Sequence, residues 1–104
     1  MLTEKQNNIL TRVEGDAPMG QLMRRHWLPA CLSDEVELPD GTPVRSRLLG
    51  EDIVVFRDTN GKLGALAEQC PHRKASLAFG RNEECGLRCL YHGWKFSVDG
   101  TVMD

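Results

Sequence analysis

The chain has 104 residues, with 13 Lys or Arg against 15 Asp or Glu, so its net charge is −2 and its pI is near 5.9. This length allows one small domain, and the absence of a basic excess argues against a nucleic-acid partner. No apolar run approaches the roughly eighteen residues of a membrane span, and the N-terminus lacks the apolar centre of a signal peptide, so we expect a cytoplasmic protein that does not enter a membrane.

The first predicted element is a short helix over residues 3–13. Thr3 followed three residues later by Gln6 is the pattern of a capping box, in which each side chain accepts the other residue's backbone N–H. The apolar residues that follow lie on one helical face: Ile9, Leu10 and Val13. Gly15 then ends the segment.

A second helix is predicted before Pro29. Its apolar residues recur at the spacing of one helical stripe: Met19, Leu22, Met23, His26 and Trp27. Such a stripe usually packs on a neighbouring element, here a sheet, and His26 is then a core or interface residue. We therefore expect a helical N-terminal leader over residues 1–29 and a separate domain over residues 30–104.

From residue 30 onward, short β-rich runs alternate with turn residues. Five strands are predicted, over residues 44–49, 53–57, 62–68, 87–89 and 95–98. Three dipeptides favour turns because Gly, Asn and Asp tolerate positive φ: Asp40-Gly41, Asn60-Gly61 and Asp99-Gly100. The pattern indicates a mostly β, antiparallel fold.

Two short segments carry the chemistry, Cys70-Pro71-His72-Arg73 and Cys89-Leu90-Tyr91-His92-Gly93-Trp94. Each lies at a strand-to-loop junction and supplies one thiolate and one imidazole. On a tight loop, each segment can give its thiolate to one iron and its imidazole to the other, as a binuclear iron–sulfur cluster with two His ligands requires. The spacing predicts four ligands: Cys70, His72, Cys89 and His92. Pro71 would stiffen the first loop, and Gly93 would allow positive φ in the second.

A structural zinc site is the alternative, because zinc also prefers Cys and His ligands. Zinc sites of this composition usually group Cys with Cys and His with His, whereas both pairs here are mixed. The two remaining cysteines, Cys31 and Cys85, are interpreted as small, buried or partly buried thiols.

At these residues the sequence resembles the N-terminal part of the large subunit of Rieske non-haem iron, ring-hydroxylating oxygenases, most closely the phthalate 4,5-dioxygenase-like group. Besides the two ligand segments, the resemblance rests on Met19-Gly20-Gln21-Leu22, Arg24-Arg25-His26-Trp27, Ala75-Ser76-Leu77 and Gly80-Arg81. Lys74 departs from the family pattern, which usually has Gly there, and it adds a charge beside the first loop.

The resemblance implies a Rieske-type antiparallel β sandwich with two cluster-binding loops and one [2Fe–2S] cluster per chain. It further implies single-electron transfer from a reductase or ferredoxin to a mononuclear Fe(II), and a trimer-based homo-oligomer. That second iron needs two His and a carboxylate. With His72 and His92 committed, His26 alone cannot supply it, so the catalytic domain is expected in a longer parent protein, beyond a Rieske domain that is cut short at its C-terminal end.

Two further comparisons come from the resemblance. In high-potential Rieske proteins a Ser two residues past the last His ligand donates to a bridging sulfide, and a disulfide joins the two loops. Trp94 occupies the place of that Ser, while Ala75 and Tyr91 occupy the disulfide positions. Fewer donors and no disulfide imply a lower reduction potential.

Other functions stay open. A free-standing Rieske ferredoxin would carry electrons without a substrate, but such proteins usually start almost directly on a strand and lack a helical leader. A zinc-stabilised interaction module is the third possibility. Charged residues near the loops either steer an acidic partner or form an ordinary solvated surface: Arg73, Lys74, Arg81, Arg88 and Lys95.

Overall fold

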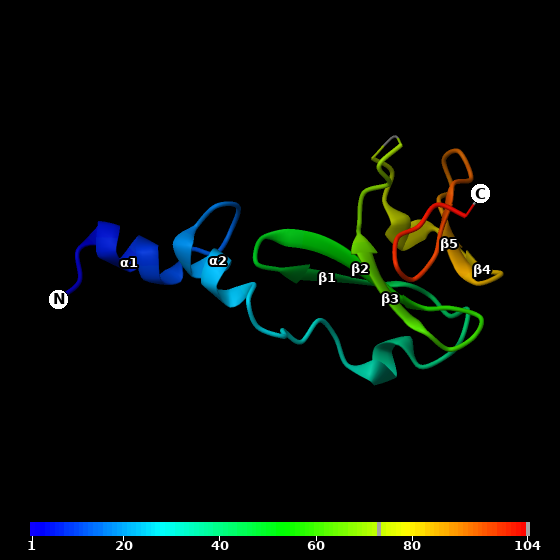
Figure 1. The fold of residues 1–104 in the computed structure, drawn as a ribbon, viewed down its shortest axis with the longest axis horizontal. Coiled ribbons are helices and arrows are strands. Elements are labelled where there is room, and N and C mark those ends of the chain that lie inside the picture. The colour runs from blue at the N-terminus through cyan, green and yellow to red at the C-terminus, as the bar shows by residue number, and fades with distance from the viewer. Residues whose placement is uncertain (73, 104) are drawn as a thin grey trace.

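The computed structural model describes residues 1–72 and 74–103. The molecule measures 54 × 30 × 19 Å, with two helices at one end and two small sheets filling the rest (Figure 1). In the described part of the chain, no helix has the length and apolar character needed to cross a membrane.

Helix α1 (Glu4–Thr11) begins at the predicted capping box. The Gln6 N–H donates to Thr3 Oγ1 at 3.1 Å, and the Thr3 N–H donates to Gln6 Oε1 at 2.9 Å. The helix ends two residues earlier than predicted and has no buried residue. Its stability therefore depends on capping more than on packing.

Helix α2 (Pro18–Met23) is shorter than predicted. After Arg24, the N–H groups of Arg25 and His26 bond to carbonyls three residues back, which tightens the chain into a turn. Pro29 disfavours a helical residue before it. Trp27 is fully exposed and His26 is also exposed, so the expected stripe packed on a sheet, with His26 in a core, is wrong. An ion pair between Arg24 and Glu51, with Nη2 and Oε1 2.5 Å apart, links this segment to the first sheet.

The first sheet has the antiparallel order β1-β2-β3, with strands β1 (Val44–Leu48), β2 (Glu51–Arg57) and β3 (Leu63–Ala67). All three strands were predicted. Asn60-Gly61 forms the turn between β2 and β3 as expected. The turn between β1 and β2 uses Leu49 and Gly50, both with positive φ (51° and 81°). Leu49 gave no sequence signal because Leu rarely adopts this conformation.

The second sheet has the antiparallel order β4-β5-β6, with strands β4 (Arg81–Glu83), β5 (Gly86–Arg88) and β6 (Lys95–Phe96). Strand β4 was not predicted. It joins β5 through Glu84 and Cys85, both at positive φ (48° and 65°), where Gly or Asn is usual. Contacts from elsewhere hold this turn: the Cys85 N–H donates to Thr59 Oγ1 at 2.8 Å, and Lys95 Nζ donates to the Glu84 carbonyl at 3.0 Å.

The other two predicted turns form, in different settings. Asp40 has positive φ (58°) in a loop before β1 and not in a hairpin. Asp99 and Gly100 turn the chain after β6, and the Asp99 carboxylate accepts hydrogen bonds from the Ser97 hydroxyl and the Thr101 N–H. These hydrogen bonds stabilise the charged carboxylate and lower the pKa of Asp99 to about 2, and the bond from Ser97 has the largest effect.

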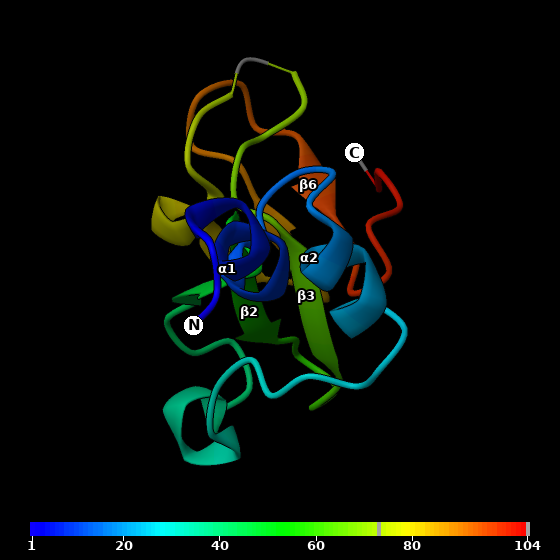
Figure 2. The ribbon, with the colours of Figure 1, turned by 90° about the vertical axis from the view of Figure 1, so that its left-hand side faces the viewer.

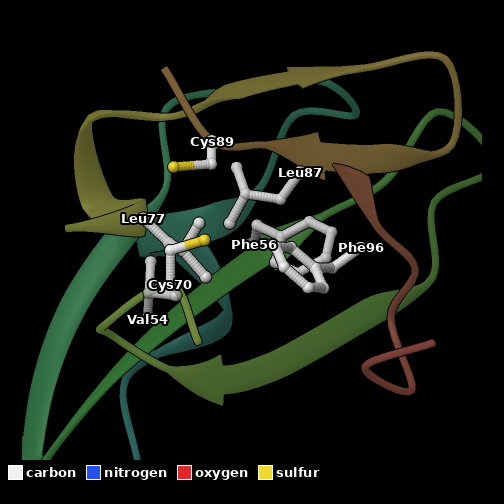
Figure 3. Packing of buried hydrophobic residues seen from close by; sticks show 7 residues of the cluster. All are labelled: Val54, Phe56, Cys70, Leu77, Leu87, Cys89 and Phe96. Atoms are coloured by element: carbon white, nitrogen blue, oxygen red, sulfur yellow. The ribbon is translucent and has the colours of Figure 1, made fainter. Parts of the chain in front are cut away.

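The core draws buried side chains from both sheets and from the short 3-10 helix Leu77–Phe79 (Figure 3). Its members are Val54, Phe56, Cys70, Leu77, Leu87, Cys89 and Phe96. The mostly β, antiparallel fold is thus confirmed, and two of the four expected ligands belong to its core. The packing of the hydrophobic core therefore also sets the positions of these two cysteines.

Asn82 on β4 joins the second sheet to the first. Its Nδ2 donates to the Gly41 carbonyl at 2.9 Å and to the Arg57 carbonyl at 2.8 Å.

We expect Asn82→Ala to lower the free energy of unfolding by about 1–3 kcal/mol, because partly buried carbonyls lose their donor. Urea denaturation measures the change. Asn7→Ala, on the exposed helix α1, is the control, and its free energy of unfolding should stay within about 0.5 kcal/mol of the wild-type value. If both variants lose the same stability, the proposed role of Asn82 is contradicted.

Candidate metal centre

Two loops project from the same side of the molecule (Figures 1 and 2). Loop 70–75 follows β3, and loop 89–94 connects β5 to β6. Both begin with a cysteine whose N–H donates to the carbonyl five residues on: Cys70 to Ala75 at 2.7 Å, and Cys89 to Trp94 at 2.7 Å. The two loops are thus closed at their base by the same hydrogen bond.

The tips of the two loops match as well. The Lys74 N–H donates to the Cys70 carbonyl at 2.6 Å, and the Gly93 N–H donates to the Cys89 carbonyl at 3.0 Å. Both donor residues have positive φ, 60° for Lys74 and 79° for Gly93. The expectation for Gly93 is confirmed. Lys74, the departure from the family pattern, occupies the equivalent left-handed position in the first loop, where a side chain is strained.

The two cysteine side chains lie inside the protein. Cys70 is 1% exposed and Cys89 is 2% exposed. Figure 3 shows both thiols at one end of the core, with Phe56 and Phe96 at the other. The apolar surroundings keep water from the two sulfur atoms, and this arrangement suits cysteines that bind a metal inside the protein.

The two imidazoles lie at the exposed tips of the loops. The Nδ1 atoms of His72 and His92 are 3.2 Å apart, and the rings are tilted by 57° with centroids 4.7 Å apart. Two nitrogens bound to one tetrahedral metal at about 2.1 Å would be about 3.4 Å apart. The observed separation therefore allows both Nδ1 atoms to bind the same iron.

Between the loops is a small hollow, lined by Cys70, His72, Cys89, Tyr91, His92 and Trp94. Residues 1–72 and 74–103 hold no group of three or more His, Cys, Asp or Glu arranged about a single ion. The donors occur as two pairs, buried thiols and exposed imidazoles. This donor set fits a group with two metal atoms, one for each pair.

A buried carboxylate, paired with an exposed arginine, supports the first loop, and no sequence pattern predicted it. Glu68, just before Cys70, is 8% exposed; its carboxylate accepts Ser76 Oγ at 2.7 Å and Arg45 Nε at 2.9 Å. The Glu68 carbonyl accepts the Leu77 N–H at 2.7 Å. Because Glu68 and Ser76 flank the loop, these bonds hold its two ends together. The available signal was a carboxylate at the end of a predicted strand.

The predicted charged surface near the loops needs correction. Arg88 donates to the Gly93 carbonyl and has its Nε 3.9 Å from Glu83 Oε1, so it supports the second loop. Lys95 is buried and bonds to the Glu84 carbonyl. Lys74 and Arg81 are exposed, and Arg73 lies outside the described residues. Lys95 therefore does not belong to a solvated surface, and Arg88 and Lys95 both make contacts within the fold, whereas the steering of an acidic partner stays a prediction.

The outcome for the other cysteines agrees with expectation. Cys31 and Cys85 are partly buried, and all four cysteines of the chain are free. Cys85 lies in the turn between β4 and β5, where Asn60 Nδ2 is 3.3 Å from its sulfur. It lines no part of the hollow, so the structure brings together the predicted four residues and leaves the other two apart.

Comparisons with known proteins agree with this geometry. The model of the Rieske [2Fe-2S] domain family matches residues 26–104. The chain is 67% identical, over its whole length, to the phthalate 4,5-dioxygenase oxygenase subunit of Pseudomonas putida, and 52% identical to the 3-chlorobenzoate-3,4-dioxygenase oxygenase subunit of Comamonas testosteroni. It covers 24% of each of these proteins, and so spans about a quarter of the length of these curated relatives.

The fold is also similar to solved structures. The crystal structure of dicamba monooxygenase bound to dicamba superposes with a TM-score of 0.70 and 31% sequence identity. The match covers 77% of this chain and 24% of that one. The fold of about three quarters of this chain is therefore similar to part of a solved oxygenase structure.

The strained backbone at Lys74 gives a prediction about stability. Lys74→Gly should raise the free energy of unfolding by about 0.5–1 kcal/mol, because the left-handed conformation costs an L-residue more than Gly loses in chain entropy. Lys74→Ala is the matched control, since it removes the charge and keeps the strain. Thermal unfolding followed by circular dichroism compares the three chains. If Lys74→Ala raises the stability as much as Lys74→Gly does, the gain comes from removal of the charge and not from relief of backbone strain.

Proposed function

This chain belongs to the Rieske [2Fe–2S] domain family, and on that premise we propose that it is the electron-entry portion of a ring-hydroxylating oxygenase. The observation that supports this most is the pairing of donors, with two buried thiols and two exposed imidazoles around one hollow. Residues 30–104 form the proposed Rieske domain and residues 1–29 its leader.

We propose Cys70 and Cys89 as ligands of an inner iron and His72 and His92 as ligands of an outer one. The buried thiols would keep one side of the group away from water, and the exposed imidazoles would lie nearest to a docked protein. Both Nδ1 atoms must be unprotonated to bind metal, so the imidazoles are neutral when the group is held. With only two thiolates, the oxidised group is formally neutral and accepts a single electron more readily than one with four.

The imidazole end is the proposed route for electrons. Leu90 and Tyr91 are exposed beside His92, so a partner could approach the ring closely. The proposed donor is a reductase or ferredoxin, supplied in turn by NAD(P)H. Lys74 and Arg81 are the exposed charges available near the loops for an acidic partner.

The proposed acceptor is a mononuclear iron in a catalytic domain outside this chain. The oxygenase subunits that the chain resembles are about four times as long, which leaves room for such a domain. Their names point to aromatic acids, phthalate and 3-chlorobenzoate, as the substrate class. The alternative is a free-standing Rieske ferredoxin. The gene can decide between them. If the sequence that it encodes after residue 104 contains two His and one Asp or Glu that can bind a mononuclear iron, the oxygenase is favoured.

The ligand proposal predicts the composition of the purified protein. Anaerobically purified chain should contain two irons and two acid-labile sulfides, and after reduction it should give an electron paramagnetic resonance spectrum with the low average g value of a His-ligated cluster. Cys70→Ser, Cys89→Ser, His72→Ala and His92→Ala should each abolish this spectrum, because each removes one ligand.

The remaining cysteines supply matched controls. Cys31→Ser and Cys85→Ser should keep iron, sulfide and spectrum, because neither residue lines the hollow. Stoichiometric zinc in place of iron would refute the proposal, and loss of the cluster in the Cys85 variant would show that the ligand set is wrong.

The surroundings of the hollow predict a low reduction potential. Trp94 lies where high-potential relatives have a Ser hydroxyl donor, and the indole lies against His72. With fewer donors to stabilise added negative charge, we expect a midpoint near the low end of the Rieske range, about −150 mV. Protein-film voltammetry at neutral pH measures it, and a midpoint above zero would contradict the argument from donors.

A further inference from the structure

The two loops have no covalent connection. Every cysteine of the chain is free, and Ala75 and Tyr91 occupy the positions at which related proteins carry a disulfide. Besides the contacts that anchor each loop to the fold, side-chain contacts join the two loops to each other. One such contact is a ring stack between His72 on the first loop and Trp94 on the second (4.4 Å between centroids, 1° between planes).

Trp94 is the fixed member of this pair. Its carbonyl accepts the Cys89 N–H at 2.7 Å, and its ring packs against the core and lies 6.5 Å from the Phe96 ring. His72, by contrast, is exposed. The last side-chain torsion of a histidine is broad, so a ring in solvent samples many planes. A rigid indole on one face selects a single plane.

Two contacts act on the orientation of the His72 ring. The indole fixes the plane of the imidazole, and the 3.2 Å approach of the two Nδ1 atoms fixes its rotation within that plane. Tyr91 cannot do the same, because its ring contacts His92 from the adjacent position of the same loop and is exposed. In the described chain, Trp94 is the aromatic residue whose ring stacks across the two loops.

We propose that Trp94 is a positioning residue that braces the loops in place of a disulfide. It holds the His72 imidazole in the plane in which Nδ1 faces that of His92, and it keeps water from one face of this ring. The inference rests on the proposed ligand role of His72. It adds that the orientation of this ligand, and the polarity around it, depend on an indole from the opposite loop.

The test uses the full chain loaded with its cluster, as wild type and as Trp94→Leu, Trp94→Phe and Trp27→Leu. Trp27 is the matched control, because its ring is fully exposed and the substitution is the same. Loss of one aromatic contact should make Trp94→Leu release iron to a chelator about two- to tenfold faster than wild type. Its midpoint potential should rise, because water reaching the His72 ring stabilises the added negative charge. Trp94→Phe should recover most of both properties, and Trp27→Leu should match wild type.

Equal potentials, g values and release rates in Trp94→Leu and Trp27→Leu would overturn the inference. So would a Trp94→Phe variant no closer to wild type than Trp94→Leu, since the ring itself would then be irrelevant. If circular dichroism shows Trp94→Leu unfolded, Trp94→Phe and Trp94→Met are compared instead: a raised potential in Met alone supports the brace, and equal values refute it. Failure of the proposed function would be seen separately, as a wild-type chain without a His-ligated cluster.

Discussion

The candidate site depends on one constraint, the closure of two loops by the same pair of backbone hydrogen bonds. In each loop the cysteine donates its N–H five residues ahead and accepts an N–H from four residues ahead. This places each cysteine at the base of its loop, inside the core, and sends the following His to the tip. Burial of the thiols and exposure of the imidazoles both follow from this loop conformation.

The loops are held from outside by different means. A buried carboxylate, Glu68, joins the two ends of the first loop through Ser76 and is paired with Arg45. In the second loop, Arg88 bonds to the Gly93 carbonyl. Burial of the Glu68 carboxylate is unfavourable unless it is paired, and Arg45 and Ser76 supply its partners.

Non-Gly residues with positive φ occur in the first loop, at Lys74, and in turns elsewhere in the fold, at Asp40, Leu49, Glu84 and Cys85. Such residues persist only where neighbouring contacts determine the conformation, and the contacts are visible: Lys74 donates within its own loop, while the turn at Glu84 and Cys85 is held by Lys95 and Thr59. Contacts within the fold thus offset the local backbone strain at these positions.

The sequence by itself determined the fold class, five of the six strands in the described part of the chain, the capping of α1 and the four Cys and His residues among those that line the hollow. These follow from local rules, since alternation, turn residues and ligand spacing act over a few positions. The tertiary structure alone decided the rest. Strand β4, the exposure of Trp27 and the burial of Lys95 depend on contacts between distant segments, and so does the stack of Trp94 on His72. Spacing along the chain carries no information about which ring will face another across two loops, because that depends on how the two sheets pack.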